Sequence, residues 1–517
     1  MITPPVSTTG RRKRPSIWVL APVLLLVGLS LLPLLYVGLK AWQAGLHEAI
    51  RLLWRPYVLR LLGNTLMLMA GVTAACVVIG VSLAWLLERS DLAGRRLWGV
   101  ILCLPFAVPA FVSGFTWVSL SSGFEGLGGA ILVMTLSKYP LVFLPVAATL
   151  RNLDTSLEES ARTLGQNRTG VFFKVTLPLL WPAVLGGALL IALHMLVEFG
   201  ALSILGLQTF TTAIYQQFEL EFSNTNAAML SALLLVLCLL LLWLELRVRG
   251  TARHIRTGQG AARRATPLRL GPWRVVAQLY CLLLVVVGSG VPLGMLGYWL
   301  VKGSSAAFPV AAIGEALLTS LSLALGGAAL CLALALPVGL LVVRHRGRLA
   351  IWAERLPYLL HALPGLVIAL TLVYFALHYV PAMYQTTGLL LLAYALLFLP
   401  LAQAPVRNAL NKAAPQLEEA ARTLGATPFT AFCRVTLPII FPAMAAAFAL
   451  VFLDGMKELT ATLVLAPTGM TTLATEVWSH TSNMEFAAAA PYAALLILIS
   501  GVPVYLLTTR MYLSHTR

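Results

Sequence analysis

Long apolar runs alternate with short polar segments along the whole sequence. A helix that crosses a bilayer needs about 20 mostly apolar residues, because each residue rises about 1.5 Å and the hydrocarbon core is about 30 Å thick. Twelve runs satisfy this requirement, so the pattern predicts an all-α polytopic membrane protein. The predicted spans are 17–39, 58–87, 98–120, 127–150, 177–206, 226–246, 275–300, 316–343, 356–378, 387–406, 437–466 and 487–509.

Composition supports this pattern and excludes a water-soluble protein. Hydrophobic residues make up 59% of the 517 residues, and only 11% are charged. A soluble domain carries about 25% charged residues. The chain therefore has too few charges to cover a surface that faces water.

The net charge of +17 comes from Lys and Arg residues on one side of the predicted spans. If the N-terminus is cytoplasmic, cytoplasmic segments hold 29 of the 36 Lys and Arg residues, external segments hold six, and Lys457 falls within a span. This is the distribution that the positive-inside rule produces, so we expect both termini in the cytoplasm. The basic charge is thereby explained, and we expect no nucleic-acid partner.

The second half of the chain repeats the first. Each half has six predicted spans, an even number, so both halves enter the membrane from the same side as a parallel repeat. Residues 158–183 and 418–443 are identical at 14 of 26 positions, with an offset of 260. Earlier positions match with an offset of 255: Cys76 with Cys331, Arg89 with Arg344, Pro109 with Pro364, and Pro145 with Pro400.

We therefore predict five consecutive segments. They are a basic N-terminus (1–16), a first six-span half (17–246), a basic linker (247–274), a second half (275–509) and a tail (510–517). The linker carries eight Arg residues with Gly, Thr and Pro, which is typical of a solvated connection. Attraction to anionic lipid is the alternative interpretation of its charge.

One charged segment occurs in both halves, between the fourth and fifth spans and on the cytoplasmic side. We call residues 151–178 the first repeated segment and residues 407–438 the second. In each, apolar residues recur at i, i+4 and i+7 and form one face of a short helix. These residues are Leu157, Ala161 and Leu164 in the first segment and Leu417, Ala421 and Leu424 in the second.

The ends of these short helices are also marked in the sequence. Ser156 with Glu159 fits a capping box, and Pro415 suits the first turn of the second helix. Gly165 and Gly425 are placed to end each helix in a left-handed cap. A short cytosolic helix with one apolar face suits docking into a groove of a partner. The parallel repeat predicts two such partner sites related by a pseudo-twofold axis.

Both repeated segments resemble the signature of permease subunits of bacterial ABC importers, in which Glu-Ala-Ala is followed after three residues by Gly and, nine residues later, by Ile-x-Leu-Pro. The second segment differs from it by Val435 in place of Ile, and the first by Val175 in place of Ile and Ser160 in place of Ala. The resemblance implies a MetI-like type I importer permease fold and a coupling helix in a cleft of an ATPase. The residues that match the coupling positions are Glu159, Ala161, Gly165, Glu419, Ala421 and Gly425.

The energy source is expected on other chains. A phosphate-binding loop of the Walker type needs Gly followed by Lys, and none of the seven lysines follows a glycine. We therefore expect no enzyme activity, catalytic residues or cofactor in this chain, with ATP and Mg on two copies of a partner ATPase. The resemblance also implies a periplasmic substrate-binding protein, membrane lipid around the spans, and the bacterial inner membrane as the location.

The fifth and eleventh predicted spans contain charged residues, and ionisable groups within a membrane are costly and often functional. Glu198 and Glu458 occupy equivalent repeat positions, and Asp454 and Lys457 lie beside Glu458. Two carboxylates facing a central pathway would suit passage of a hard cation. The alternative is that Lys457 neutralises its neighbours and the cluster holds helices together.

The surroundings of these residues resemble fused ferric-iron permeases, which carry two six-span halves in one chain. The matching stretches are residues 198–215 and 452–478, with Thr460 where that family usually has Pro. The resemblance implies import of ferric iron, and related fused permeases import thiamine or phosphonates. A secondary transporter, which also uses internal repeats, and a membrane-bound enzyme are alternatives that the repeated signature disfavours.

Other candidate ligands lack the spacing of a site. His194, His361 and His378 lie in spans and are expected to be satisfied within the helices or to line the pathway. The six cysteines form no CxxC pair, so we expect neither a disulfide nor a metal site.

Overall fold

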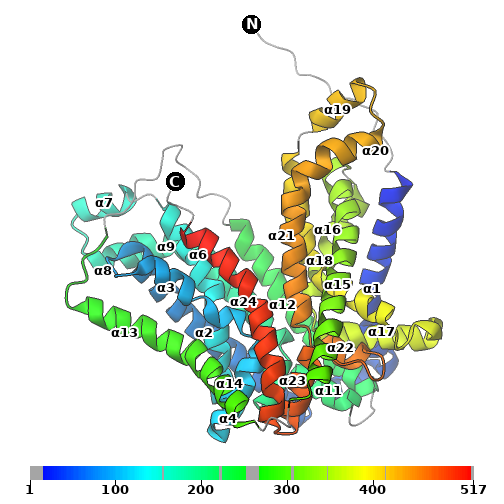
Figure 1. The fold of residues 1–517 in the computed structure, drawn as a ribbon, viewed down its shortest axis with the longest axis horizontal. Helices are drawn as coiled ribbons and strands as arrows, with labels where there is room; N and C mark the ends of the chain where they lie inside the picture. The colour runs from blue at the N-terminus through cyan, green and yellow to red at the C-terminus, as the bar shows by residue number, and fades with distance from the viewer. Residues whose placement is uncertain are drawn as a thin grey trace. The chain divides into compact units, whose positions relative to one another are not determined.

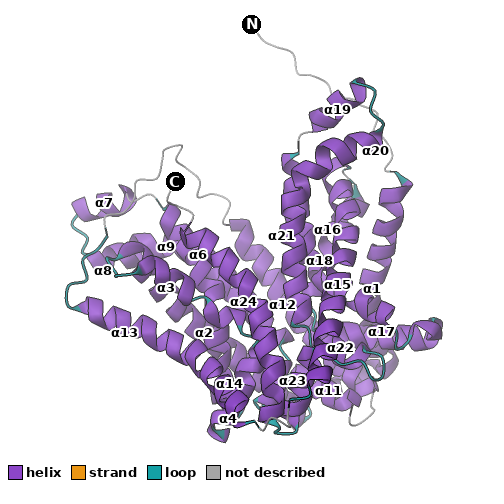
Figure 2. Cartoon of the chain, viewed as in Figure 1, coloured by secondary structure: helices purple, strands orange, loops and turns teal. Residues whose placement is uncertain are grey.

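The computed structural model describes residues 16–153, 156–219, 224–251, 267–303, 308–345, 347–413 and 415–513. Helices dominate this part of the chain, and the residues described there contain no strand beyond one isolated bridge between Ser90 and Leu268 (Figure 2). The predicted all-α class is therefore confirmed. The helix bounds are α1 Ile17–Leu53, α2 Pro56–Arg89, α3 Arg95–Ile101, α4 Ala110–Leu120, α5 Gly126–Lys138, α6 Pro140–Asn152, α7 Ser156–Thr163, α8 Arg168–Val171, α9 Leu177–Val197, α10 Gly200–Ile204, α11 Phe210–Glu219, α12 Asn224–Thr251, α13 Trp273–Val285, α14 Val291–Lys302, α15 Val310–Arg344, α16 Arg348–His361, α17 Gly365–Tyr379, α18 Thr387–Lys412, α19 Pro415–Thr423, α20 Pro428–Ala431, α21 Leu437–Met456, α22 Thr460–Leu465, α23 Leu473–Ser482 and α24 Phe486–Leu513 (Figure 1).

The apolar helices match the twelve predicted spans. Within the described ranges, nine helical segments are long and apolar enough to cross a membrane, and two pairs of shorter helices pass the same test together. Residues 486–502 form one further apolar helix that is shorter. Each of these twelve features overlaps one predicted span. The linker prediction for 247–274 falls largely on residues outside the described ranges.

Two predicted spans are broken rather than continuous, which corrects the prediction for 98–120 and 356–378. The breaks fall at Pro109 and Pro364, which have extended backbone angles and directly precede α4 and α17. A proline also disfavours helical geometry in the residue before it. Both prolines occupy the same repeat position, so the two halves break their third span at the same place.

By contacts the chain divides into two compact units that do not follow the sequence repeat. The larger unit comprises Tyr36–Ser322, Ala362–Thr387 and Met456–Arg517, and the smaller unit comprises Met1–Leu35, Leu323–His361 and Gly388–Gly455. Each unit mixes helices of both halves. The predicted boundaries of the two halves describe the sequence repeat, and they stay a prediction.

In the larger unit, α2, α6 and α9 pack closely against one another. Glycines allow this approach: a Cβ on Gly80 would lie 2.9 Å from the backbone nitrogen of Phe143, and one on Gly187 would lie 2.9 Å from the carbonyl oxygen of Leu141. The fully buried Tyr139 lies just before α6 and donates a hydrogen bond to the Leu102 carbonyl at 2.5 Å. These contacts hold together α6 and α9, the helices that lead into and out of the first repeated segment.

The smaller unit also buries residues at equivalent repeat positions. Tyr394, the repeat equivalent of Tyr139, is buried on α18 against the α15 residue Gly327. The thiol of Cys331 lies 3.9 Å from the Tyr394 carbonyl oxygen, whereas that of Cys76 lies 3.6 Å from the Thr135 carbonyl oxygen in the larger unit. The two units therefore bury the same repeat positions but do not make identical contacts.

Neighbouring glycines on α9 provide a direct test of this packing. Gly187→Val should lower the apparent Tm and the yield of folded protein in detergent, because the added carbons meet the α6 backbone. We expect a loss of about 1–3 kcal/mol, as for overpacking of a core. Gly186→Val is the matched control, because a Cβ at Gly186 meets nothing within 4 Å. Equal losses in both variants would contradict the proposed packing.

Candidate functional site

The first repeated segment forms a short helix that ends as the sequence predicts. After α7, Gly165 has a positive φ of 82°, a conformation that a side chain disfavours. Its N–H donates to the Arg162 carbonyl at 3.0 Å, and the Gln166 N–H donates to the Ala161 carbonyl at 3.1 Å. This is a Schellman cap, and it confirms the predicted left-handed end. The helix α7 begins at Ser156 itself, and the predicted capping box of Ser156 with Glu159 stays a prediction.

The second repeated segment has the same geometry. The helix α19 begins at Pro415, as predicted, and Gly425 has a φ of 92°. The N–H groups of Gly425 and Ala426 donate to the carbonyls of Arg422 and Ala421, each at 3.1 Å. Each segment then passes through one turn of π-helix, η3 (Phe172–Thr176) or η8 (Phe432–Thr436), into α9 or α21. Such turns are frequent at functional sites.

The predicted docking face carries exposed apolar side chains in both segments. Leu164 is 82% exposed and Leu424 is 88% exposed. Ala161 is buried, and Ala421 is half-buried. Leu157 and Leu417, on the same faces, are 51% and 48% exposed, so the apolar face of each short helix is open to solvent.

The glutamates of the Glu-Ala-Ala signature and the glutamates directly before them lie in different surroundings. Glu159 and Glu419 are exposed. Glu158 lies 3.2 Å from the guanidinium of Arg89 and accepts a hydrogen bond from Thr176 at 3.0 Å. Sequence reasoning missed Glu158, although the repeat already placed Arg89 and Glu158 at positions that recur.

The equivalent residues of the second half make the same contacts. Glu418 forms an ion pair with Arg344 and accepts a hydrogen bond from Thr436. Arg344 ends α15 as Arg89 ends α2, and Thr436 ends η8 as Thr176 ends η3. One carboxylate thus joins three elements in each half.

Glu198 and Glu458 lie where two predicted spans end early, which corrects the bounds 177–206 and 437–466. The helices α9 and α21 stop at Val197 and Met456, and the short helices α10 and α22 follow. The Glu198 carboxylate accepts the N–H of Ala201 at 3.2 Å, in the first turn of α10. Free N–H groups at a helix start favour a negative charge, so each carboxylate occupies a position that stabilises the following helix.

Glu458 is held more firmly than Glu198. It is 8% exposed and accepts four hydrogen bonds. The donors are the N–H groups of Ala461 at 3.0 Å and Thr462 at 3.1 Å, and the hydroxyls of Thr460 at 3.0 Å and Thr462 at 2.9 Å. Thr460, which differs from the usual proline of ferric-iron permeases, thus supplies a donor to this carboxylate.

The remaining predicted residues lie near this break. Asp454 is exposed in the last turn of α21, and Lys457 is half-buried just after it.

No group of three or more His, Cys, Asp or Glu side chains within the described ranges is arranged to hold a metal ion. The ring nitrogens of His194, His361 and His378 each lie 2.7–2.8 Å from a backbone carbonyl, as expected for satisfied histidines.

The larger unit also brings together aromatic side chains from both halves beyond these breaks. Phe199, directly after Glu198, lies 4.9 Å from Tyr215 and 6.4 Å from Trp478 between ring centroids. Tyr215 and Trp478 lie 5.7 Å apart. Phe199 directly follows the break of the first half, so this cluster lies beside that break.

The helices α11 and α23 begin with the same threonine cap but continue differently. The N–H of Thr209 donates to the hydroxyl of Thr212 at 2.8 Å, and that of Thr472 donates to Thr475 at 2.8 Å. Counting from these caps, Ala213 and Gln217 of α11 correspond to Glu476 and His480 of α23.

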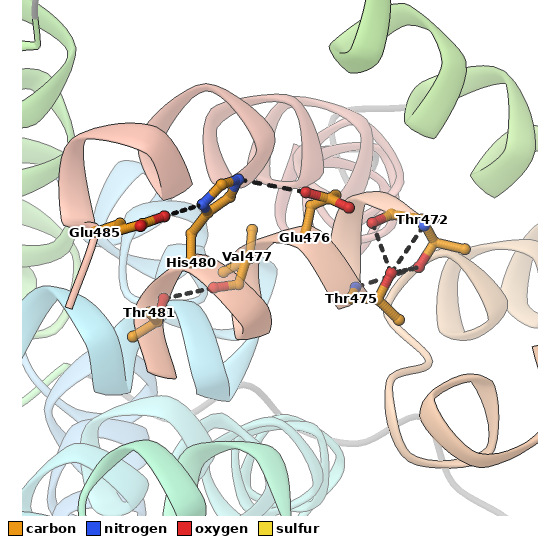
Figure 3. Close-up of polar contacts among 7 residues, drawn as sticks. All are labelled: Thr472, Thr475, Glu476, Val477, His480, Thr481 and Glu485. Atoms are coloured by element: carbon orange, nitrogen blue, oxygen red, sulfur yellow. Dashed lines mark hydrogen bonds and ion pairs between the residues drawn. The ribbon is translucent and has the colours of Figure 1, made fainter. Parts of the chain in front are cut away.

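The extra charges of α23 form a local cluster, drawn in Figure 3. The two ring nitrogens of His480 point to different carboxylates, one to Glu485 at 2.7 Å and the other to Glu476 at 3.3 Å. By the predicted topology this cluster lies on the external side. The two repeats are therefore alike in their repeated segments and unlike here.

Comparison with known proteins identifies the class of this architecture. The chain matches the family described as the binding-protein-dependent transport system inner membrane component twice, at residues 76–249 and 332–513. It therefore belongs to this family of multi-pass membrane transport permeases, with two copies of the family domain in one chain.

Individual relatives refine this assignment. The chain is 46% identical over 500 residues to the Fe(3+)-transport system permease protein FbpB 2 of Haemophilus influenzae, covering 96% of this chain and 98% of the relative. It is 32% identical to the molybdenum transport system permease protein ModB of Haemophilus influenzae over 35% of this chain. The sulfate transport system permease protein CysT of Salmonella typhimurium is 34% identical over 32% of this chain.

The two capping carboxylates should differ in their contribution to stability. Glu458→Gln should lower the free energy of unfolding by about 2 kcal/mol, because it removes the charge from a buried acceptor of four hydrogen bonds. Glu198→Gln is the matched control at the repeat equivalent, and we expect it to cost less than half as much. Thermal unfolding of both variants in detergent measures the difference. An equal loss would show that the extra hydrogen bonds of Glu458 do not stabilise the fold.

Proposed function

We propose that this chain is the membrane-spanning permease of an ATP-driven importer for ferric iron. The observation that carries the proposal is the double occurrence of one docking helix, with the same Schellman cap and the same exposed leucine in both halves. A single chain that presents two such helices does the work of two ordinary permease subunits. The substrate assignment is supported by near full-length similarity to a relative whose name specifies Fe(3+) transport.

The proposed partners follow from this arrangement. Two ATPase subunits would receive α7 and α19 and would hold ATP and Mg, with no cofactor in this chain. A periplasmic substrate-binding protein would deliver iron on the external side, and lipid would surround the spans in a bacterial inner membrane. The excess of Lys and Arg around the repeated segments supports a cytoplasmic position for them and for both termini.

For the pathway we propose that Glu198 and Glu458 contribute negative charge beside the helix breaks. Their hydrogen bonds to the following helices support a second role, in which they hold the break in shape. Both roles suit an iron pathway. Irregular backbone within a membrane is tolerated only where it is buried in protein or lines a water-filled cavity, and a pathway is such a cavity. Asp454 and Lys457 extend the same charged region.

Thiamine, phosphonate, molybdate and sulfate are alternative substrates within the same class of transporter. The matches to ModB and CysT cover about a third of this chain, which favours iron over molybdate and sulfate. A secondary transporter is disfavoured because it needs no docking helices.

Docking can be tested at the exposed leucines. Leu164→Asp combined with Leu424→Asp should abolish co-purification of the ATPase, because a carboxylate would be buried without a partner in its groove. We expect binding to weaken at least about 100-fold, which is an interface energy of roughly 2–3 kcal/mol. Leu164→Met with Leu424→Met keeps the apolar face and is the control. Normal co-purification of the aspartate variant would contradict the docking role.

The substrate can be tested by uptake of radiolabelled ferric iron in cells that lack their own iron importers. These cells would express the chain with the ATPase and binding protein of its own organism. We expect uptake with the wild-type chain and at least a tenfold loss with Glu159→Ala combined with Glu419→Ala, because these side chains are exposed on the docking helices. An assembled complex that imports no iron would refute the iron assignment. Uptake that persists in the variant would refute coupling through these glutamates.

A further inference from the structure

An ion pair anchors each docking helix to the end of a membrane span, and the inference drawn from it rests on the proposed function. In the first half, Arg89 is the last residue of α2 and its side chain is 8% exposed. Its Nη2 atom lies 3.2 Å from Oε1 of Glu158, a side chain that is 12% exposed on α7. The Nε and Nη2 atoms make no hydrogen bond with a described residue, so the carboxylate of Glu158 supplies the compensating charge.

The same carboxylate is tied to the span that follows. The hydroxyl of Thr176, at the end of η3, donates to Oε1 of Glu158 at 3.0 Å. Thr176 is buried and directly precedes α9. Glu158 therefore links α7 to α2 on one side and to α9 on the other.

The second half contains the same three-residue arrangement. Arg344, Glu418 and Thr436 stand 255, 260 and 260 residues after Arg89, Glu158 and Thr176. Arg344 pairs with Glu418, and Thr436 donates a hydrogen bond to it. We call Arg89, Glu158 and Thr176 the first anchor, and Arg344, Glu418 and Thr436 the second anchor.

Other cytoplasmic ion pairs do not recur in this way. Arg151 pairs with Glu88 of α2, whereas Arg407, which follows the same Leu-Pro stretch in the second half, pairs with Glu354 of α16. Among the ion pairs of the described residues, the anchors recur with both partners at equivalent positions. The feature common to the two anchors is the docking helix that each holds.

Each docking helix needs such an anchor because it is short. Helices of eight or nine residues are marginally stable by themselves, and their position is set by contacts with the rest of the chain. The Schellman cap fixes where the helix ends but attaches it to nothing else. The carboxylate, which is 12% exposed in Glu158 and 15% exposed in Glu418, gives each helix a fixed point on two spans.

The first anchor also receives the end of the linker. The N–H of Leu268 donates to the Arg89 carbonyl at 2.8 Å, and the N–H of Leu270 donates to the Asp91 carboxylate at 2.9 Å. The chain that leads into the second half is thus attached at the base of the first docking helix. Movement at this point reaches α2, α9 and the start of α13.

We propose that Arg89 and Arg344 are positioning residues that transmit displacement of the docking helices to α2 and α15. They act through Glu158 and Glu418 and touch neither substrate nor nucleotide. When the partner ATPases move the docking helices, the anchors make each helix and its adjoining spans move together. Without the anchors, the helices stay docked and ATP is hydrolysed with little transport.

The test measures iron imported per ATP hydrolysed in proteoliposomes that contain the chain, its ATPase and binding protein loaded with radiolabelled ferric iron. Glu158→Gln with Glu418→Gln removes both anchor charges and keeps the shape of the side chains. We expect iron imported per ATP to fall about fivefold or more, with ATPase co-purification unchanged. Glu88→Gln with Glu354→Gln is the matched control, because it removes ion pairs that join spans and not docking helices.

A second measurement separates the ion pair from general destabilisation. Arg89→Gln combined with Glu158→Gln should be no worse than either single variant, because both remove the same interaction. Additive losses would overturn the proposal, as would a transport ratio equal to that of the control or a loss of ATPase co-purification that explains the lost uptake. A wild-type complex that binds no ATPase or imports no iron would refute the proposed function itself, and the inference with it.

Discussion

The structure depends on one constraint, which is that lipid offers no hydrogen bonds to a polypeptide backbone. Every break in a membrane-crossing helix frees N–H and carbonyl groups that the protein must satisfy itself. The breaks after Val197 and Met456 are followed by short helices whose first N–H groups meet the carboxylates of Glu198 and Glu458. The two carboxylates, which are costly in a membrane, thus accept hydrogen bonds from N–H groups that would be costly to leave unpaired.

The same constraint explains where the chain has freedom to vary. The docking helices α7 and α19 lie outside the apolar helices, so the glycine caps satisfy their last carbonyl groups locally and their exposed side chains are free for recognition. Removal of one partner from a buried ion pair costs about 3–5 kcal/mol, because the other charge stays buried and uncompensated. A single substitution of Arg89 or Glu158 is therefore expected to cost more stability than substitution of the exposed leucines.

Much of this architecture could be predicted from the sequence, because its signals are periodic or local. Apolar run length located the apolar helices, of which nine are long enough to span and two more are bent pairs within the described ranges, and Gly165 and Gly425 predicted the ends of the docking helices correctly. The breaks at Pro109 and Pro364 were missed, since membrane helices also accommodate prolines without breaking, as α18 does at Pro400. The pairing of Arg89 with Glu158 joins residues 69 positions apart, and such a contact depends on how helices pack rather than on a local pattern.

The cluster of Glu476, His480 and Glu485 distinguishes the second half of the chain from the first. The first half carries Ala213 and Gln217 where the second carries Glu476 and His480. Under the proposed function, two identical ATPase subunits require the same surface twice, and the two docking helices retain it. A substrate-binding protein without an internal twofold axis would instead meet two unlike surfaces and could bind in only one orientation. The loss of repeat symmetry at α23 would thereby fix the orientation of the binding protein, while the preserved symmetry of α7 and α19 would divide the load between the two ATPase subunits.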